Sequence, residues 1–151
     1  MFGRMQRSAD FELVLATPAR ARSAHFAAHH VPQPPGTTRR RRNRAEHTEL
    51  STGDAETCAQ PVDESIPQVP DRCWFGTVVP KRHARKAATR NLLRRQIRAA
   101  MDRHHTTLAH GLWLVRLRAP FDVGRYRSAG SDALRLAARS ELDALLMQAA
   151  A

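Results

Sequence analysis

The densest positive charge in the sequence lies in residues 81–105, KRHARKAATRNLLRRQIRAAMDRHH. This segment has nine Lys or Arg residues and one Asp, a net charge of +8 with His neutral, compared with +11 for the whole chain. Arginine guanidinium groups bind phosphate oxygens in a planar, bidentate geometry. The chemistry that these residues favour is therefore the binding of a polyphosphate, and RNA is the polyphosphate that we expect.

A helix from about Lys86 to Arg103 would position these groups. At 3.6 residues per turn one face is apolar, and it carries Leu93, Ile97, Ala100 and Met101. The opposite face carries Asn91, Arg94, Arg95 and Arg98. Arg90 falls near the start of the helix, where Arg90 and Asn91 either contact RNA or organise the turn after Pro80.

No pattern in the sequence predicts catalysis by the chain itself. The sequence has no GxxxxGK[ST] loop, no GxGxxG, no HExxH and no GxSxG. Cys58 and Cys73 are far apart and no His or Cys group has metal-ligand spacing, so no metal ligands are predicted. No apolar run is long enough for a signal peptide or a membrane span, so we expect a cytoplasmic protein that makes no membrane contact.

Apolar periodicity predicts the remaining elements. They are a helix at 9–16 with Phe11, Val14 and Leu15, strands at 24–31, 75–79 and within 111–120, and a final helix capped by Ser131 or Asp132. The third strand is expected to bury one face. The final helix has an apolar stripe of Leu134, Ala138, Leu142, Leu145 and Leu146. The strand–helix–strand unit around the basic helix predicts an α+β fold, an α/β sandwich with a small central sheet.

Residues 33–71 interrupt this pattern. They are rich in Pro, Thr and acidic residues, include an arginine run from Arg39 to Arg44, and contain almost no large apolar residue. Such a segment cannot bury enough surface to offset the entropy lost on ordering. We therefore expect residues 1–151 to form a single RNA-binding domain with a disordered insertion at about 33–71.

The segment VVPKRHARKAATRNLLRRQIR resembles the signature of the bacterial ribonuclease P protein subunit. The matching positions are Lys81, Arg82, Ala87, Arg90, Asn91, Arg94, Arg95, Ile97 and Arg98. The early Asp10-Phe11 pair and the Ser23-x-x-Phe26 segment also match the family pattern. The sequence departs from that pattern at Leu92, where the family's Arg-Asn-Arg core has its second arginine.

The resemblance implies a fold and a function. The fold is an α/β sandwich of the ribosomal protein S5 domain 2 type, with the basic helix in a βαβ crossover. The function is that of the protein subunit of an endoribonuclease that removes the 5′ leader of precursor tRNA. In that family the RNA subunit hydrolyses the phosphodiester bond with Mg²⁺, and one protein monomer binds one RNA. By matched position, the RNA-binding residues would be Lys81, Arg82, Arg90, Asn91, Arg94, Arg95 and Arg98, and the leader-binding cleft would contain Phe11, Leu15 and His29.

Alternatives remain for the function and for single residues. Charge alone also fits a basic structural RNA-binding protein, such as a ribosomal protein, and fits less well a peripheral membrane protein with a basic amphipathic helix. Phe11 is expected either to stack on a leader base or to anchor the first helix in the core. Strand alternation points His29 away from Phe26 and so away from the core, which favours contact with the leader.

Overall fold

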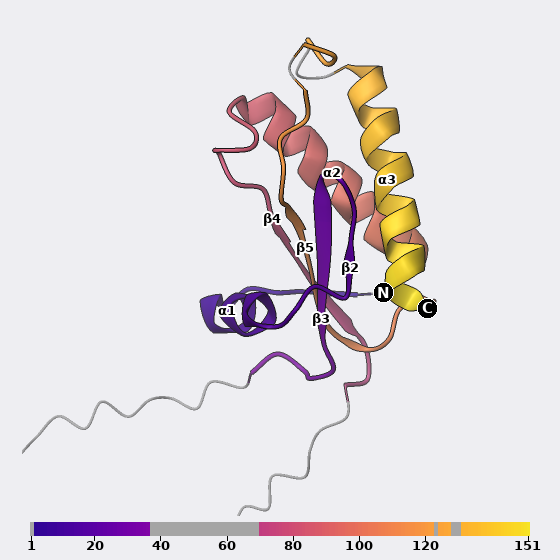
Figure 1. Cartoon of the computed structure of the whole chain (residues 1–151). Helices are drawn as coiled ribbons and strands as arrows, with labels where there is room; N and C mark the ends of the chain where they lie inside the picture. The colour runs from indigo at the N-terminus through magenta and orange to yellow at the C-terminus, as the bar shows by residue number, and fades with distance from the viewer. Residues whose placement is uncertain (1, 37–69, 123, 128–130) are drawn as a thin grey trace, which may run out of the picture.

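The computed structural model describes residues 2–36, 70–122, 124–127 and 131–151 (Figure 1). The strands in these residues are β1 (Gly3–Arg4), β2 (Ala21–Arg22), β3 (Phe26–Val31), β4 (Cys73–Val78) and β5 (Gly111–Leu117). The helices are α1 (Ser8–Ala16), α2 (Ala87–His104) and α3 (Asp132–Ala150). Most of the insertion predicted at 33–71, with its arginine run, lies outside the described residues, so its disorder stays a prediction.

The five strands form one sheet with the order β1-β4-β5-β3-β2. β4 and β5 are adjacent and parallel, and α2 connects them, whereas β3 pairs antiparallel with β5 on its other side. The predicted α+β class and the strand–helix–strand unit are confirmed. The sequence analysis missed β1 and β2, because two residues are too short to show an alternating pattern.

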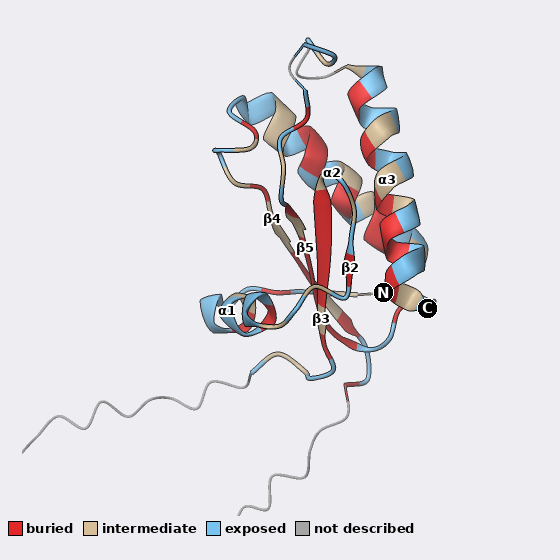
Figure 2. Ribbon diagram, in the orientation of Figure 1, coloured by how far each residue is buried: buried red, intermediate tan, exposed pale blue. Residues whose placement is uncertain are grey.

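The larger hydrophobic core lies between the sheet and the helices α2 and α3 (Figure 2). The predicted apolar stripe of α2 is confirmed, because its members are completely buried: Leu93, Ile97, Ala100 and Met101. The stripe predicted for α3 is buried too, and it consists of Leu134, Ala138, Leu142, Leu145 and Leu146. Burial of one large aliphatic side chain contributes about 1.5–3 kcal/mol. Packing therefore fixes the rotation of α2 about its axis, and with it the direction of its charged face.

A smaller core lies on the opposite face of the sheet, under α1. Its buried residues are Met5, Val14, Val31, Leu112 and Leu114. β5 contributes to both cores, since Trp113, Val115 and Leu117 face the other way. The expectation that this strand buries only one face is therefore wrong. The physical reason is that β5 lies in the middle of the sheet and α1 covers its second face.

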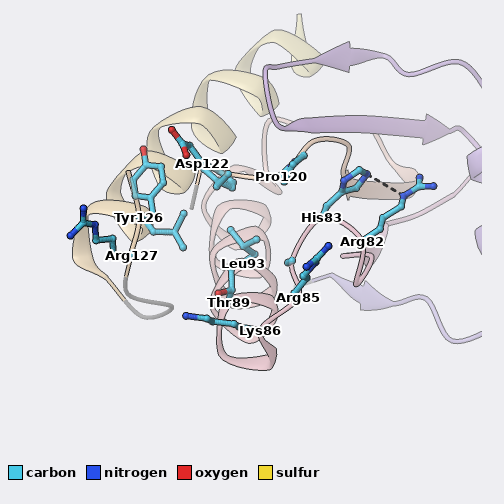
Figure 3. A pocket seen from close by; sticks show the side chains of 13 residues that line it. Arg82, His83, Arg85, Lys86, Thr89, Leu93, Pro120, Asp122, Tyr126 and Arg127 are labelled. Carbon is cyan, nitrogen blue, oxygen red and sulfur yellow. Dashed lines mark hydrogen bonds between the residues drawn. The ribbon is translucent and has the colours of Figure 1, made fainter. Parts of the chain in front are cut away.

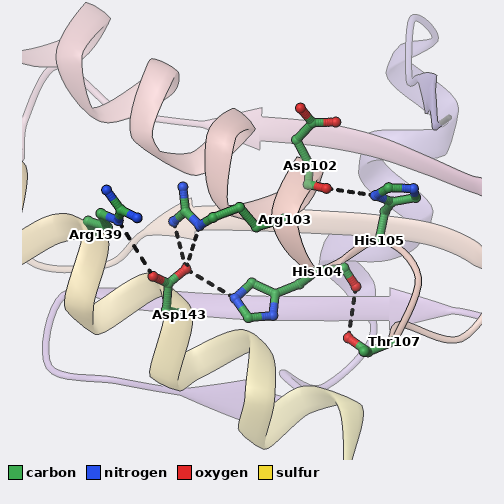
Figure 4. Close-up of polar contacts among 7 residues, drawn as sticks. All are labelled: Asp102, Arg103, His104, His105, Thr107, Arg139 and Asp143. Atoms are coloured by element: carbon green, nitrogen blue, oxygen red, sulfur yellow. Dashed lines mark hydrogen bonds and ion pairs between the residues drawn. The ribbon is translucent and has the colours of Figure 1, made fainter.

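Polar contacts tie α3 to the rest of the fold. Ser131 caps the helix, as predicted, because its Oγ accepts a hydrogen bond from the backbone N–H of Leu134 at 3.2 Å. The Asp143 carboxylate bridges α3 and α2: its Oδ1 accepts from Arg103 Nη2 at 2.6 Å and lies 3.1 Å from His104 Nε2 (Figure 4). Burial would raise the pKa of Asp143, but these two partners hold it below the ordinary value of an aspartate.

Glu141 makes the second tie, to the turn between β2 and β3. It accepts hydrogen bonds from the Ser23 hydroxyl and from the His25 backbone N–H, and His25 Nδ1 lies 2.7 Å from its Oε2. Burial alone would raise the pKa of Glu141, yet the hydrogen bonds from Ser23 and His25 lower it. Glu141 and Asp143 therefore attach α3 to the rest of the fold, and the lowered pKa of each favours its charged form.

Candidate nucleic-acid interface

The exposed face of α2 is an arginine surface, which we define by Arg94, Arg95 and Arg98. All three side chains are exposed, and Asn91 lies among them. Within the part of the chain that the structure describes, none of the three guanidinium groups forms an ion pair. A surface helix normally balances such charges with acids at i±3 or i±4. Asp102 is the one acid of α2, at i+4 from Arg98, and it forms no ion pair with that arginine. Three arginines against one carboxylate leave the surface with a net positive charge, which suits phosphate.

Two more of the predicted residues extend this charge beyond the start of α2. Lys81 and Arg82 lie in the turn that follows β4, and both are exposed. Arg82 Nε donates to Nε2 of His83 at 3.2 Å. The helix begins after Lys86 without a side-chain cap and without an acidic residue in its first turn, which leaves its positive end uncompensated.

Arg90 differs from the other predicted RNA-binding residues because part of its guanidinium group forms hydrogen bonds within the fold. The side chain is half-buried, and its Nη1 donates to the backbone carbonyls of Ala84 at 3.0 Å and of Arg85 at 2.7 Å. These bonds hold the turn that leads into α2. Of the two roles left open by the sequence, organisation of this turn is the one with direct contacts.

Leu92 is the position where the sequence departs from the family pattern. It is only 7% exposed and packs in the larger core, so an arginine there would have to bury its stem. A neighbouring hollow is lined by Asn91 and Arg95 of α2 and by Arg135 of α3. Arg135 thus adds a guanidinium beside the site of the missing arginine. Sequence analysis missed it because only the packing of α3 on α2 brings it there.

Phe11 and Leu15, two of the three residues predicted for the leader-binding cleft, lie at the surface of α1. Leu15 is 37% exposed, and Phe11 is half-buried with its ring over Gly76 of β4. A Cβ at position 76 would come within 2.7 Å of Phe11 Cε1. The glycine therefore makes the space in which this ring lies. Phe11 packs against the smaller core and so anchors α1, and it still presents part of its ring at the surface. Stacking on a leader base stays a prediction.

His29 is on the same side of the sheet as Phe11, but the structure buries it. Its side chain is 3% exposed, and Nδ1 lies 2.9 Å from the backbone carbonyl oxygen of Thr17. Alternation correctly points it away from Phe26, yet the expectation that it lies away from packed residues is wrong because α1 and Thr17 cover it. Burial lowers the pKa of His29, and the positive charges of Arg116 and Arg22 lower it further.

Arg116 and Arg22 are functional candidates that sequence analysis did not single out. Arg116 follows Leu114 in the alternation of β5, and Arg22 follows the core residue Ala21, so both point to the α1 side of the sheet. Arg22 is exposed, whereas Arg116 is half-buried and its Nε has no hydrogen-bond partner among the described residues. The α1 side therefore has its own positive charge, close to His29.

The arginine surface and the α1 side meet at the edge of β4. β1 pairs with β4 only at Trp74 and Phe75, so residues 76–78 have no strand partner on that edge among the described residues. A hollow of about 120 Å³ at this point is lined by Phe11 and Gly76 from one side and by Arg98 from the other. One RNA molecule, or two that lie side by side, could contact both surfaces.

No group of three or more His, Cys, Asp or Glu side chains among the described residues comes together in a way that could hold a metal ion. None of the helices in the same residues combines the length and the apolar character needed to cross a membrane.

Comparison with known proteins identifies the family. The model of the family Ribonuclease P matches residues 2–140, which include the arginine surface and the α1 side. The chain belongs to the Ribonuclease P family. This match confirms the resemblance seen in the signature, and it favours that interpretation over a ribosomal protein.

Individual ribonuclease P proteins agree with the family match. The chain is 43% identical to the ribonuclease P protein component of Paraburkholderia xenovorans over 76 residues, 50% of this chain and 55% of that relative. It is 37% identical to the component of Bordetella parapertussis over 90 residues, 60% of this chain and 65% of the relative. The chain thus matches less than two thirds of the length of these relatives.

A solved structure shows the same fold. The Staphylococcus aureus ribonuclease P protein superposes with a TM-score of 0.56, covering 97% of this chain and 94% of its own. Its sequence identity is 15%, so this likeness concerns the fold alone.

Proposed function

We propose that this chain is the protein component of ribonuclease P, which binds the RNA subunit and the 5′ leader of precursor tRNA and so assists maturation of the tRNA 5′ end. The observation that carries the proposal is the unbalanced arginine surface of α2, held in place by a fully buried opposite stripe. An RNA backbone supplies the dense negative charge that this surface lacks within the described residues.

The proposed contacts to the RNA subunit come from α2 and the turn before it. Phosphates would bind at the seven residues of the signature, Lys81, Arg82, Arg90, Asn91, Arg94, Arg95 and Arg98, and at Arg135. Arg90 would act mainly by fixing the turn, since its Nη1 is already used by two carbonyls. The other side chains are exposed and can reach a partner without any change in the fold.

The proposed path of the tRNA leader runs along the α1 side. Phe11 would stack on a base and Leu15 would give an apolar contact, as both are accessible. His29 would support the cleft, because its Nδ1 contacts the Thr17 carbonyl after the end of α1. Arg22 and Arg116 would attract the leader phosphates. This division places the RNA subunit and the leader on the two surfaces that meet at Arg98.

We assign phosphodiester hydrolysis and the Mg²⁺ that it uses to the RNA subunit. Two half-buried carboxylates of α3 fit this assignment, since Glu141 and Asp143 are already paired with hydrogen-bond donors of the fold. In this proposal the chain works in the cytoplasm, as one monomer on one RNA, and its own residues only bind and orient RNA.

Reconstitution tests the proposal. The full chain is added to the ribonuclease P RNA of the same genome at low Mg²⁺, and cleavage of a precursor tRNA is followed. We expect strong stimulation, and the absence of any stimulation would contradict the proposal. Co-sedimentation with ribosomes and indifference to precursor tRNA would instead indicate a ribosomal protein.

A further inference from the structure

A hollow of about 430 Å³ lies where the start of α2 meets the loop between β5 and α3 (Figure 3). It opens on the helix side of the sheet, because its floor belongs to the larger core. The α1 side, with Phe11, lies across the sheet. Its volume is in the range of about 300–1,000 Å³ that is typical of small-molecule sites.

The inside of the hollow is apolar and partly aromatic. Leu93 and Leu134 form its floor, and both are almost completely buried. Tyr126 is half-buried and meets Phe121 edge-on, with ring centroids 5.8 Å apart and an interplanar angle of 79°. The exposed Arg125 lies 5.8 Å from the Tyr126 ring centroid. A tyrosine held in this way offers ring surface to a flat group beside it, and Arg125 contacts the same ring without lining the hollow.

The rim of the hollow is positively charged. Arg82, Arg85 and Lys86 are exposed along the side that leads into α2. Asp122 is the acid at the rim, and its Oδ1 accepts the backbone N–H of Gly124 at 2.9 Å. The uncapped first turn of α2 adds to the positive potential. The hollow therefore suits a ligand with a flat apolar body and an anionic group at its edge.

We propose that this hollow holds one unpaired nucleotide of the ribonuclease P RNA subunit, with its base against Tyr126 and its phosphate at Lys86 and the first turn of α2. The inference rests on the proposed function. It adds recognition of a base to the proposed contacts of α2, which are otherwise contacts with phosphates. Base-specific RNA recognition in proteins uses unpaired bases on aromatic side chains. The hydroxyl of Thr89, which also lines the hollow, can donate to or accept from the edge of the base.

The position of the hollow selects the RNA subunit over the tRNA leader as the source of the nucleotide. Arg82, one of the proposed contacts to the RNA subunit, lines the hollow, and the hollow lies at the start of the helix that carries the arginine surface. The proposed path of the leader lies across the sheet. A double helix cannot enter a hollow of about 430 Å³ between α2 and the loop, so the nucleotide that it holds must be unpaired.

The test compares two variants at Tyr126 in the full chain, by titration of the ribonuclease P RNA at several salt concentrations. Tyr126→Leu keeps apolar volume and removes the ring, and Tyr126→Phe keeps the ring. We expect Tyr126→Leu to weaken binding by between about fivefold and about 150-fold, the range for one base–aromatic stack, with an unchanged salt slope. Tyr126→Phe should bind like the wild type, and thermal unfolding checks that each variant is folded.

A charge variant and a photocrosslink complete the test. Lys86→Ala should flatten the log–log salt slope by roughly 1, while Arg72→Ala, at the far end of β4, should leave it unchanged. Tyr126→p-benzoylphenylalanine should crosslink to one or two adjacent unpaired nucleotides of the RNA subunit. This arm does not require the leucine variant to fold.

The outcomes separate this inference from the proposed function. If the wild-type chain fails to bind the RNA, the proposed function is wrong and the nucleotide site with it. If the wild type binds and Tyr126→Leu binds equally well, only the nucleotide site is refuted. A crosslink to the tRNA leader, to paired RNA or to no RNA also overturns it.

Discussion

Gly76→Ala should displace Phe11 and weaken binding of the tRNA leader without affecting the RNA subunit. A Cβ at position 76 would lie 2.7 Å from Phe11 Cε1 and 2.9 Å from Cζ, whereas ordinary contact begins at 3.4 Å. The ring must therefore move by about 0.7 Å, the difference between 3.4 and 2.7 Å. Since Phe11 is half-buried, it can swing outward, and the fold should survive at a cost of roughly 1–3 kcal/mol in the free energy of unfolding.

The expected loss of leader affinity follows from the stack that Phe11 is proposed to make. One base–aromatic stack contributes about 1–3 kcal/mol, so removing it should weaken leader-dependent affinity by about 5- to 150-fold. The assay compares the dissociation constants of the holoenzyme for precursor tRNA and for mature tRNA. Gly36→Ala is the matched control, because a Cβ there meets its nearest atom, Asp10 Oδ1, only at 3.4 Å.

A double-mutant cycle decides whether Gly76 acts through Phe11. With Phe11→Ala the added methyl group of Gly76→Ala meets only Leu114 Cδ1, at 3.1 Å, which has to shift by a few tenths of an ångström. The double variant should therefore bind the leader no more weakly than Phe11→Ala alone. Normal leader affinity in Gly76→Ala, when Phe11→Ala loses it, would refute the steric reasoning. Normal leader affinity in Phe11→Ala would refute the proposed role of the ring.

Three further predictions concern the arginine surface, α3 and pH. The double variant Arg94→Ala/Arg98→Ala should bind the RNA subunit more weakly and lose about 2 units of the log–log salt slope, as measured by titration from low to moderate salt. Both Arg135 and Arg139 lie near an acid of α3, at 3.3 Å from Asp132 and 3.9 Å from Asp143, but only Arg135 lines the hollow beside Asn91 and Arg95. Arg135→Ala should therefore lose roughly 1 unit of slope, whereas Arg139→Ala should lose none. Because the pKa of His29 is lowered in the folded chain, the stability that this group contributes is complete above its unfolded pKa of about 6.5 and is lost as the pH falls below it. Denaturant unfolding at pH 7.5 and 5.5 should therefore show a smaller difference for His29→Gln than for the wild type.

Specific results would contradict these expectations. An unchanged salt slope in the α2 double variant would show that its arginines remain in solvent when RNA is bound. Equal slopes for Arg135→Ala and the wild type would place the RNA away from α3. A pH dependence of unfolding that is the same with and without His29 would show that His29 does not titrate with folding.

The helices were predictable from sequence because their signal is continuous. The stripe of Leu93 and Ile97 repeats over several turns, and tertiary packing only confirms a face that the spacing already defines. The burial of β5 on both faces was not predictable, since polar Arg116 and Arg118 in its alternation indicate an exposed side. Leu112 and Leu114 are buried because of α1, an element about 100 residues earlier in the chain.

The candidate site was predictable to the extent that it is local. Arg94 and Arg98 follow from the period of one helix, but Arg135 joins them only through the packing of two helices. His29 shows the limit of alternation, which assigns a side of the sheet and cannot say what covers that side. The hollow at Tyr126 combines two loops and two helices, so no spacing in the sequence indicates it.

The place of β5 in the sheet has a consequence for the order of folding. β3 and β4 share no hydrogen bonds, because β5 lies between them and pairs with both. During synthesis the sheet therefore stays in two unconnected parts until residues 111–117 have emerged from the ribosome, and the last of the three central strands completes it. Loop-closure entropy grows slowly with length, by about 0.6 kcal/mol per doubling, so a long connection between β3 and β4 adds little to the cost of closing the sheet. A nascent chain that ends before β5 cannot form the native sheet, whatever the length of the connection between β3 and β4.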